Sequence, residues 1–596
     1  MSAPSELYGI QPKTVTRPTN DTPYADKYWD ADKNRRELSS NGLRLVHTLA
    51  HSENSSPTPA SEPHFTPHSG LADSHIVPVG KATNVKDLQP HRSDVNPAQW
   101  GVAALAVSEP FKTRSHKHKP AALRWDHRLS TESASREGCT LKAAFKHLQK
   151  PGMISLGGGI PLSEYIPFES LEHAVVPLNN TDGDKGSPKT IGLQSSKTDI
   201  SSGNSVYDLT VALNYCQGSG SAQLLRWLTE HVELVHNPPY ADWQCTMSVG
   251  NTSALDITLR MFAQPGDYVL SDDYTFSSAV ETALPMGARF LGVEMDAEGL
   301  IPQSLHDILQ NWDPAAHGGS RKPFLLYSVP TGQNPTGATQ SLQRRKDIYR
   351  VAQQHDLIIM EDDPYYYIQM DKFDPSAENS QDDSTPKSPE ALLEVLIPTY
   401  LSIDTDGRVV RMDSFSKVVS PGLRVGWVTS SQQIIERYKI HADVSTQGPS
   451  GFSQLALFKL LDEHWGHSGF LQWLLHLRKE YSTRRTFLAN ACDRHLPKDI
   501  VTWNVAEAGM FQWLKVDWRK HPDAKTKSAA QIEEEIWLES IGEGVLVARG
   551  SWFQATANKE YPDVFYRITF AAAPLDKIEE AVARLGEALK RSFKLQ

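Results

Sequence analysis

Cysteine is scarce in this chain of 596 residues, and long apolar runs are missing from it. The four cysteines, Cys139, Cys216, Cys245 and Cys492, show neither CxxC spacing nor the density of a disulfide scaffold, so we expect free thiols in a reducing compartment. No apolar run reaches the roughly 18–20 residues that a membrane helix needs. A membrane is therefore not an expected partner.

Positive charge is also in deficit. The chain has 60 Lys and Arg against 71 Asp and Glu, a formal net charge of -11. Such a balance gives no field that would attract nucleic acid or an anionic membrane surface, so neither is expected as a partner. The start, "MSAPSELYGIQPKTV", lacks the apolar core of a signal peptide, and the first forty residues are unlike a mitochondrial presequence. We expect a soluble, cytoplasmic protein.

The first part of the chain is poor in apolar residues. Residues 1–130 are rich in Ser, Thr, Pro, His and Asn, with short apolar patches such as "WGVAALAV", and this composition predicts a largely disordered extension. Its basic cluster 112–119 is interpreted as a solvated run. Two later polar stretches, 178–205 and 371–391, lack apolar periodicity and are expected to be surface loops inserted into a folded body.

From about residue 245, seven short apolar runs alternate with helical segments. The runs are "CTMSVG", "YVLSDD", "ARFLGVEM", "PFLLYSV", "LIIMEDD", "RVVRMDS" and "RVGWVTS". Strands without polar alternation imply a mostly parallel sheet that is covered on both faces, and hence an α/β body of the doubly wound type. From about residue 440 the chain is mainly helical, then gives two or three strand-like runs and a final helix, which indicates a smaller α+β domain.

Functional groups of such a sheet gather at the carboxyl ends of its strands, so the residues that end each run are informative. In "MSVGNTSALDITL" a strand is followed by Gly250, Asn251, Thr252 and Ser253 at a helix start, where free backbone N–H groups could hold a phosphate. The same residue types also cap helices that bind no ligand.

Acidic residues end another run. "LIIMEDD" closes with Glu361, Asp362 and Asp363, which are costly to bury together, so at least one is expected to meet a cation. A Mg²⁺ site is the alternative, but no Walker-type loop precedes the run, and no metal is expected. In "SVPTGQNPTGATQSL" the Pro and Gly residues are those that a turn needs for its backbone shape. The turn does not need Asn334, whose amide could face the strand ends.

The stretch "SFSKVVSPGLRVGW" contains two cations, Lys417 and Arg424, that could meet the strand-end carboxylates and a phosphate. A lysine in an apolar site has a lowered pKa and becomes a competent nucleophile. Lys417 is either such a buried lysine or an ordinary surface lysine after a strand. Arg424, with Ser414 and Ser416, would complete a dianion site with the turn at 250–253. A phosphate site, a strand-end carboxylate, an Asn, a Tyr and an activated lysine together meet the needs of pyridoxal 5′-phosphate.

With these motifs the sequence resembles the fold-type I, class I/II pyridoxal phosphate-dependent aminotransferases, in particular the fungal aromatic amino acid and the kynurenine/α-aminoadipate aminotransferases. The resemblance covers about 138–596 and rests on "MISLGGGIP", "LNYCQGSGSAQLLRWL", "GNTSAL", "NPTG", "EDDPYY", "SFSKVVSPGLRVGW" and "VFYRITFAAAP", in the family's order. It implies a segment 131–215 that contributes to the small domain and the active site, a large domain 216–440 with a mostly parallel seven-stranded sheet between helices, and a small C-terminal domain 441–596.

The resemblance also implies how the cofactor is bound. Lys417 would be the Schiff-base lysine and general base, and Asp362 the partner of the pyridine nitrogen. Asn334 and Tyr365 would flank the phenolate oxygen, and Phe276 would stack on the ring. The remaining cofactor contacts would be those to the phosphate, from Asn251, Thr252, Ser414, Ser416, Arg424 and, across a homodimer interface, Tyr215.

For the substrate, the resemblance implies that Arg567 grips the α-carboxylate, because a planar guanidinium offers two parallel hydrogen bonds. Asn334 would also lie beside the substrate, and Gly158 and Gly159 match a segment that approaches it. Tyr165 and Trp552 are either side-chain pocket residues or packing residues.

The implied activity is a ping-pong transfer of the amino group of Phe, Tyr or Trp to a 2-oxo acid such as 2-oxoglutarate. Kynurenine and 2-aminoadipate are the alternative donors, and a pyridoxal phosphate-dependent lyase or decarboxylase is an alternative reaction type. A pyridoxal phosphate-binding transcription regulator is disfavoured because residues 1–130 show no compact helical DNA-binding pattern. A scaffold protein with a dead site would be expected to have lost Lys417 or Asp362.

Overall fold

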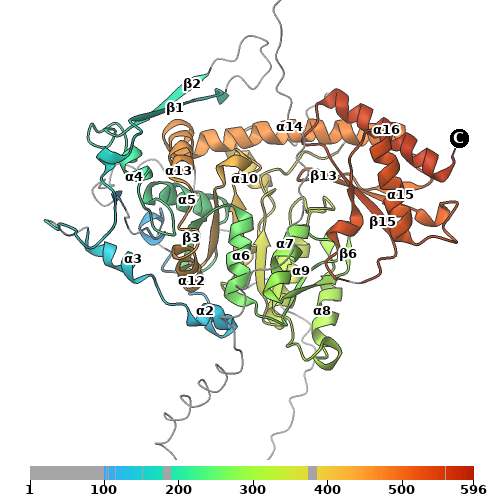
Figure 1. Cartoon of the computed structure of the whole chain (residues 1–596), viewed down its shortest axis with the longest axis horizontal. Coiled ribbons are helices and arrows are strands. Elements are labelled where there is room, and N and C mark those ends of the chain that lie inside the picture. Colours follow the sequence, from blue (N-terminus) through green and yellow to red (C-terminus); the bar gives the residue numbers. More distant parts are fainter. Residues whose placement is uncertain are drawn as a thin grey trace, which may run out of the picture. The chain divides into compact units, whose positions relative to one another are not determined.

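The structure is a computed structural model, and all the residues that it describes lie within the unit Asp73–Gln596 (Figure 1). It describes residues 100–595 apart from 103, 105, 115, 149, 151, 179–189, 374–384 and 558. The predictions for residues 1–99 and for the parts 179–189 and 374–384 of the two polar stretches lie outside the described residues.

A seven-stranded sheet forms the centre of the large domain. Its order is β3 (Trp243–Ser248), β11 (Gly426–Ser431), β10 (Val409–Ser414), β9 (Ile358–Asp362), β8 (Leu325–Ser328), β4 (Tyr268–Asp272), β5 (Arg289–Val293). All neighbours pair in parallel except β11, which is antiparallel to both β10 and β3. This confirms the predicted mostly parallel sheet of seven strands.

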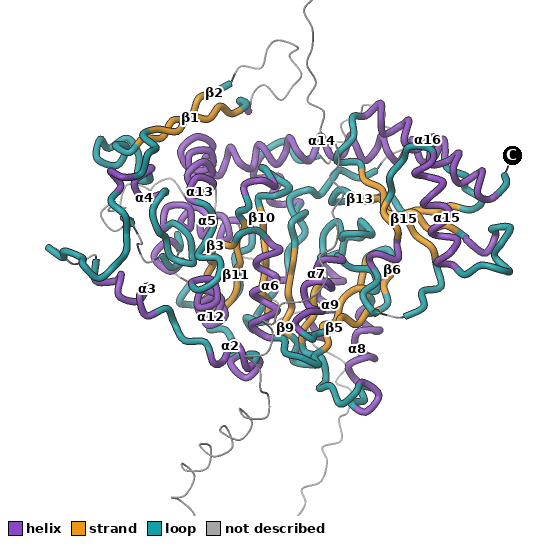
Figure 2. Tube along the Cα trace, viewed as in Figure 1, coloured by secondary structure: helices purple, strands orange, loops and turns teal. Residues whose placement is uncertain are grey.

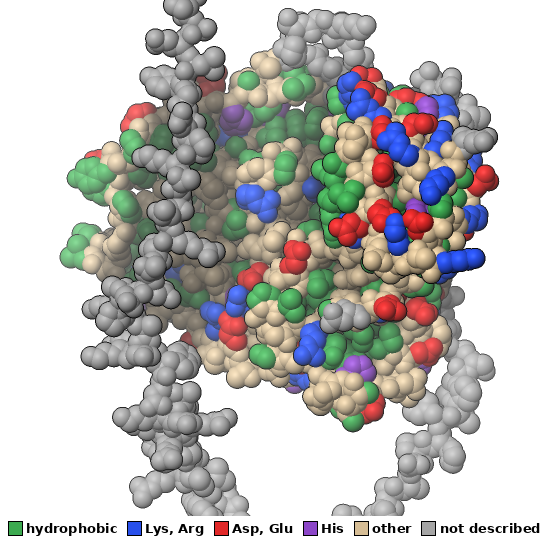
Figure 3. All heavy atoms as spheres, turned by 45° about the vertical axis from the view of Figure 1, so that its right-hand side comes forward, with side chains coloured by type: hydrophobic (Ala, Val, Ile, Leu, Met, Phe, Trp, Pro, Cys, Tyr) green, Lys and Arg blue, Asp and Glu red, His purple; other side chains and the backbone are tan. Residues whose placement is uncertain are grey.

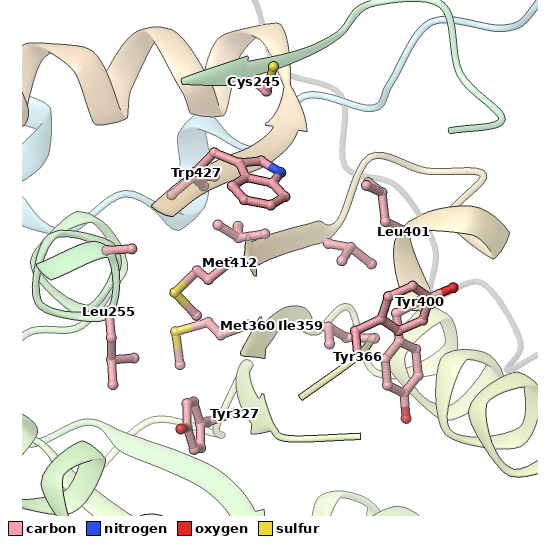
Figure 4. Packing of buried hydrophobic residues seen from close by; sticks show 14 of the residues in the cluster. Cys245, Leu255, Tyr327, Ile359, Met360, Tyr366, Tyr400, Leu401, Met412 and Trp427 are labelled. Atoms are coloured by element: carbon pink, nitrogen blue, oxygen red, sulfur yellow. The ribbon is translucent and has the colours of Figure 1, made fainter. Parts of the chain in front are cut away.

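Helices cover both faces of this sheet, which explains why its strands are apolar without alternation (Figure 2). Figure 4 shows Leu255, Tyr327, Met360 and Met412 gathered on one side of the sheet and Ile359, Tyr366, Tyr400 and Leu401 on the other. The large-domain helices are α5 (Ala222–Val235), α6 (Asn251–Phe262), α7 (Ser277–Ala283), α8 (Pro302–Gln310), α9 (Leu342–Gln354), α10 (Pro389–Val395), α11 (Tyr400–Ile403) and α12 (Gln432–Asp443).

The small domain has an antiparallel sheet with its own core, and so has the expected α+β composition. The sheet order is β12 (Val501–Trp503), β13 (Phe511–Val516), β15 (Val564–Thr569), β14 (Ala548–Arg549), and the helices are α14 (Gly466–His495), α15 (Ala529–Gly542) and α16 (Leu575–Phe593). Helix α13 (Gly451–Phe458) packs instead against α5 of the large domain. Helix α16 buries Ile578, Val582, Leu585 and Leu589, which share one face at helical spacing. Figure 3 shows basic and acidic side chains interspersed over the outer surface of this domain.

The predicted disorder of residues 1–130 is wrong for its last part. Trp100 and Trp125 are buried, and the backbone N–H of Cys245 in β3 donates a hydrogen bond of 2.8 Å to Ser108 Oγ. These residues pack on the large domain because Ala106 and the two tryptophans are buried in its core, although the surrounding composition is polar.

The polar stretch 178–205 is likewise not all loop. Its residues Ile191–Ser196 form strand β2, which pairs antiparallel with β1 (Ser170–Val175). Backbone pairing does not require the apolar periodicity on which the loop prediction depended. The segment before and after this hairpin holds the short helices α2 (Thr131–Ser135), α3 (Thr140–Ala144) and α4 (Leu209–Ala212). Among the described helices, none has the length and apolar character required to cross a membrane.

Candidate active site

The predicted strand-end residues meet at one edge of the large sheet. Asp362 is the last residue of β9, Ser414 is the last residue of β10, and the parallel register pairs Met412 with Asp362. Asn251, the first residue of α6, reaches the same place, because its Nδ2 donates to the carbonyl of Met412 at 2.9 Å. The doubly wound topology thus brings together residues that lie more than a hundred positions apart in the chain.

The Asp362 carboxylate is fixed by two donors. Asn251 Nδ2 donates to Oδ1 at 2.7 Å, and the Tyr327 hydroxyl donates to Oδ2 at 2.8 Å. Burial raises the pKa of Asp362, while these two hydrogen bonds and the positive charge of Arg411 oppose that rise. Tyr327 was missed by the sequence analysis, and the available signal was a tyrosine inside the apolar run "PFLLYSV".

Asn334 connects Tyr365 to Arg567. Arg567 Nη1 donates to Asn334 Oδ1 at 2.6 Å, and the side chains of Asn334 and Tyr365 are hydrogen-bonded to each other. Burial raises the pKa of Tyr365 and lowers that of Arg567. The Arg567 guanidinium carbon lies 4.4 Å from the ring centre of Phe511 and 4.7 Å from that of Phe553, so two aromatic faces hold it. The roles of Phe511 and Phe553 were also missed.

Lys417 lies in the turn after β10 and is only partly exposed. Burial, followed by the charges of Arg424 and Arg567, lowers the pKa of its amine. Among the described residues, none forms a hydrogen bond or an ion pair with this amine. Trp473 Nε1 in α14 donates to the carbonyl of Val418 at 2.6 Å and so holds the turn in place. The result is a positioned lysine whose amine loses its proton, and so becomes nucleophilic, at a lower pH than that of an ordinary lysine.

An anion cradle lies beside Lys417. Ser414 Oγ donates to Ser416 Oγ at 2.8 Å, and Arg424 Nη1 donates to the same Ser416 oxygen at 3.3 Å. A Cβ at Gly250, whose φ is +78°, would lie 2.3 Å from Arg424 Nη2, so only glycine leaves room for this guanidinium. Helix α6 begins at the next residue with no side-chain cap at Gly250 and no acidic residue in its first turn, which leaves its N–H groups for an anion.

Two buried polar atoms in this region lack a partner among the described residues. They are Asn251 Oδ1 and Ser248 Oγ, and a Cβ at Gly426 would come within 3.1 Å and 2.9 Å of them. Together with a free lysine amine, an open cradle for a dianion and a carboxylate aimed by two donors, they make a donor set that fits pyridoxal 5′-phosphate.

Four other predicted site residues make no contact with this set that the described residues show. Phe276 is partly buried against the large-domain core at the start of α7, and Thr252 is exposed in the first turn of α6. Tyr165 is 79% and Tyr215 is 53% exposed. The roles of these four residues stay predictions.

Gly158, Gly159 and Trp552, which were predicted to lie near the substrate, are also separate from this set. A Cβ on Gly159 would meet no atom within 4 Å, and one on Gly158 would meet Phe145 and Ile160. Trp552 packs edge-on against Trp537, with ring centres 5.6 Å apart. Substrate contact by these residues stays a prediction as well.

Comparisons with known proteins show what the chain resembles. The sequence model of the family described as "Aminotransferase class I and II" matches residues 209–585. The chain is 44% identical over 474 residues to an aromatic amino acid aminotransferase of Schizosaccharomyces pombe, covering 78% of this chain and 98% of that protein. It is 35% identical to the L-tyrosine:2-oxoglutarate aminotransferase of Serpula lacrymans var. lacrymans, covering 73% and 85%. The crystal structure of aminotransferase Aro8 from Candida albicans superposes with a TM-score of 0.75 at 38% identity, covering 80% of this chain and 100% of that one.

Proposed function

This chain belongs to the aminotransferase class I and II family, and we propose that it moves the amino group of an aromatic amino acid to a 2-oxo acid, with 2-oxoglutarate as acceptor. The observation that carries the proposal is the meeting of Asp362, Asn334 and Lys417 at one sheet edge, with Arg567 bonded to Asn334 and the Lys417 amine without a partner among the described residues. The names of the relatives support the aromatic donor and the acceptor.

The proposed cofactor is pyridoxal 5′-phosphate. Asp362 would hold its ring nitrogen, Asn334 and Tyr365 its phenolate oxygen, and Lys417 its aldehyde carbon. When bound, this cofactor supplies an electron sink for the negative charge left when an amino acid loses its α-proton. The cradle of Asn251, Thr252, Ser414, Ser416 and Arg424 would hold the phosphate, whose charge matches the exposed guanidinium and the open start of α6.

Lys417 would act as the base. Its lowered pKa increases the fraction of neutral amine that can accept the α-proton, and its turn is fixed through Val418 and Trp473. Arg567 would orient the substrate by its α-carboxylate, since one Nη is bonded to Asn334 and the rest of the guanidinium fork can face the substrate. The partly exposed ring of Phe511 beside it offers aromatic surface to an aromatic side chain.

A homodimer and a cytoplasmic location complete the proposal. Ile154 and Leu156 are 85% and 97% exposed, and exposed apolar side chains next to Gly158 and Gly159 favour burial against a second copy. In such a dimer Tyr215 would reach the phosphate of the other subunit.

A panel of amino donors tests the assignment. Phe, Tyr, Trp, kynurenine and 2-aminoadipate are each supplied with 2-oxoglutarate, and kcat/KM is measured from glutamate formation. We expect the three aromatic amino acids to give the highest values. If 2-aminoadipate or kynurenine alone is accepted, the aromatic assignment is wrong.

A further inference from the structure

Arg411 is a wholly buried cation inside β10 that the proposed chemistry does not use. Its Nη1 lies 2.9 Å from Glu361 Oε1 and 3.2 Å from Asp363 Oδ2, and its Nε and Nη2 donate to the two oxygens of Asp413 at 2.9 and 2.7 Å. The side chains of Arg411, Glu361 and Asp363 have no exposed surface, and that of Asp413 is 1% exposed. Burying one guanidinium with three carboxylates costs desolvation free energy, so we ask what this cluster does for the protein.

This cluster lies on the opposite face of the sheet from Asp362. The register pairs Arg411 with Glu361 and Met412 with Asp362, and successive strand residues point to opposite faces. Figure 4 shows the two faces, with Met360 and Met412 on the side of α6 and Tyr366 and Tyr400 on the other. Arg411 therefore lies on the face away from the place of the cofactor ring, and it can act on that place only through other residues.

Hydrogen bonds join the cluster to the segments that carry the site. Glu361 accepts the backbone N–H groups of Tyr400 and Leu401 at the start of α11, at 2.9 and 3.2 Å. The Thr331 hydroxyl donates to Asp363 Oδ2 at 3.1 Å, and Thr331 belongs to the loop that bears Asn334. The end of β9, the end of β10 and the Asn334 loop are thus tied together behind Asp362.

The charge of Arg411 also reaches Asp362 electrostatically. Burial raises the pKa of Asp362, and Arg411 is the cation whose field opposes that rise. Burial likewise raises the pKa of Asp363 to about 6 and that of Asp413 to about 7. The titratable and charged groups around Arg411 are Glu361, Asp363, Asp413, Tyr366, Tyr367, Arg345 from α9 and His236, which follows α5.

We propose that Arg411 is a positioning residue whose charge, from the far face of the sheet, keeps the Asp362 carboxylate ionised and able to hold a protonated ring nitrogen. The inference rests on the proposed function, because it assumes the cofactor assigned there. It predicts that loss of Arg411 weakens the binding of a cofactor with a ring nitrogen more than the binding of an analogue without one.

The test compares two ligands on the full-length chain after cofactor removal. Pyridoxal 5′-phosphate and its analogue with carbon in place of the ring nitrogen are titrated into the wild type, Arg411→Met and Arg411→Lys, and Kd is read from visible absorbance. One unit of pKa corresponds to a factor of ten, so Arg411→Met is expected to lose about tenfold in affinity for pyridoxal phosphate relative to the analogue. Arg411→Lys, which keeps the charge, is expected to retain the wild-type ratio.

Equal losses for both ligands in Arg411→Met would show a structural role and overturn the inference, as would a Lys variant that behaves like the Met variant. A wild type without preference for the nitrogen-containing ligand would instead remove the Asp362 assignment of the proposed function, and the inference with it.

A second variant covers the case in which Arg411→Met does not fold. Asp363 Oδ1 has no partner among the described residues, so Asp363→Asn can keep the Oδ2 contacts to Thr331 and Arg411 while one negative charge is removed. Loss of a neighbouring negative charge stabilises ionised Asp362. The pH below which the preference for pyridoxal phosphate disappears should therefore move down in this variant, and an upward shift contradicts the inference.

Discussion

Arg567 Nη1 donates a hydrogen bond of 2.6 Å to Asn334 Oδ1, which links β15 of the small domain to the strand-end loop of the large domain. The two residues are 233 positions apart in the chain. This bond places the group proposed for the substrate carboxylate next to the group proposed for the cofactor oxygen.

The first prediction concerns Arg567. Arg567→Gln removes the charged fork, and loss of charge-assisted hydrogen bonds to a carboxylate should raise KM for the amino donor about 100-fold, with cofactor affinity changed much less. Steady-state kinetics and a cofactor titration measure both. The matched control is Arg584→Gln on the exposed side of α16, which should leave both values unchanged. A KM in Arg567→Gln within about twofold of wild type would remove the assigned role.

The second prediction concerns Gly250. Gly250→Ala would place a Cβ 2.3 Å from Arg424 Nη2 at a φ of +78°, which displaces the guanidinium and strains the backbone. We expect a stability loss of about 1–3 kcal/mol and cofactor binding weaker by about tenfold or more. Thermal unfolding and cofactor titration check these values. Gly542→Ala at the end of α15, where a Cβ meets no atom within 4 Å, is the control and should be near neutral. Unchanged cofactor affinity in Gly250→Ala would contradict the cradle.

The third prediction concerns Tyr327. Its hydroxyl lowers the pKa of Asp362, so Tyr327→Phe should raise that pKa further. Because protonated Asp362 cannot pair with a protonated ring nitrogen, the acidic limb of the kcat/KM profile should move to higher pH by about one unit. Tyr349→Phe removes another buried hydroxyl, which donates to Asp404 at 2.8 Å, and serves as control. If both variants give the wild-type profile, Tyr327 does not act on Asp362.

The site residues that could be predicted from the sequence are those that stand in a recognisable pattern. Asp362, Asn251, Ser414 and Lys417 stand where apolar runs end, and a doubly wound sheet must bring such ends together, so their meeting was predictable. Tyr327 and Arg411 lie inside strands and act through partners on other strands, which no local pattern reveals.

The remaining errors have physical causes too. The burial of Trp125 depends on a tertiary surface, and the pairing of β2 with β1 depends on backbone groups that every sequence has. The positions of Gly158, Tyr165 and Tyr215 relative to a substrate depend on more than one chain in the proposed dimer, so neither the sequence nor a single chain determines them.

The central claim is that the chain transfers the amino group with Lys417 as base and does not eliminate or decarboxylate. The most direct measurement follows the label from nitrogen-15 phenylalanine in the presence of 2-oxoglutarate, with wild type, Lys417→Ala and the control Lys498→Ala, a surface lysine paired with Asp493. Nitrogen-15 glutamate should appear in equal amount to phenylpyruvate in the wild type and in Lys498→Ala, and neither product should accumulate with Lys417→Ala. Release of labelled ammonia or of phenethylamine by the wild type, or full transfer by Lys417→Ala, would contradict the account.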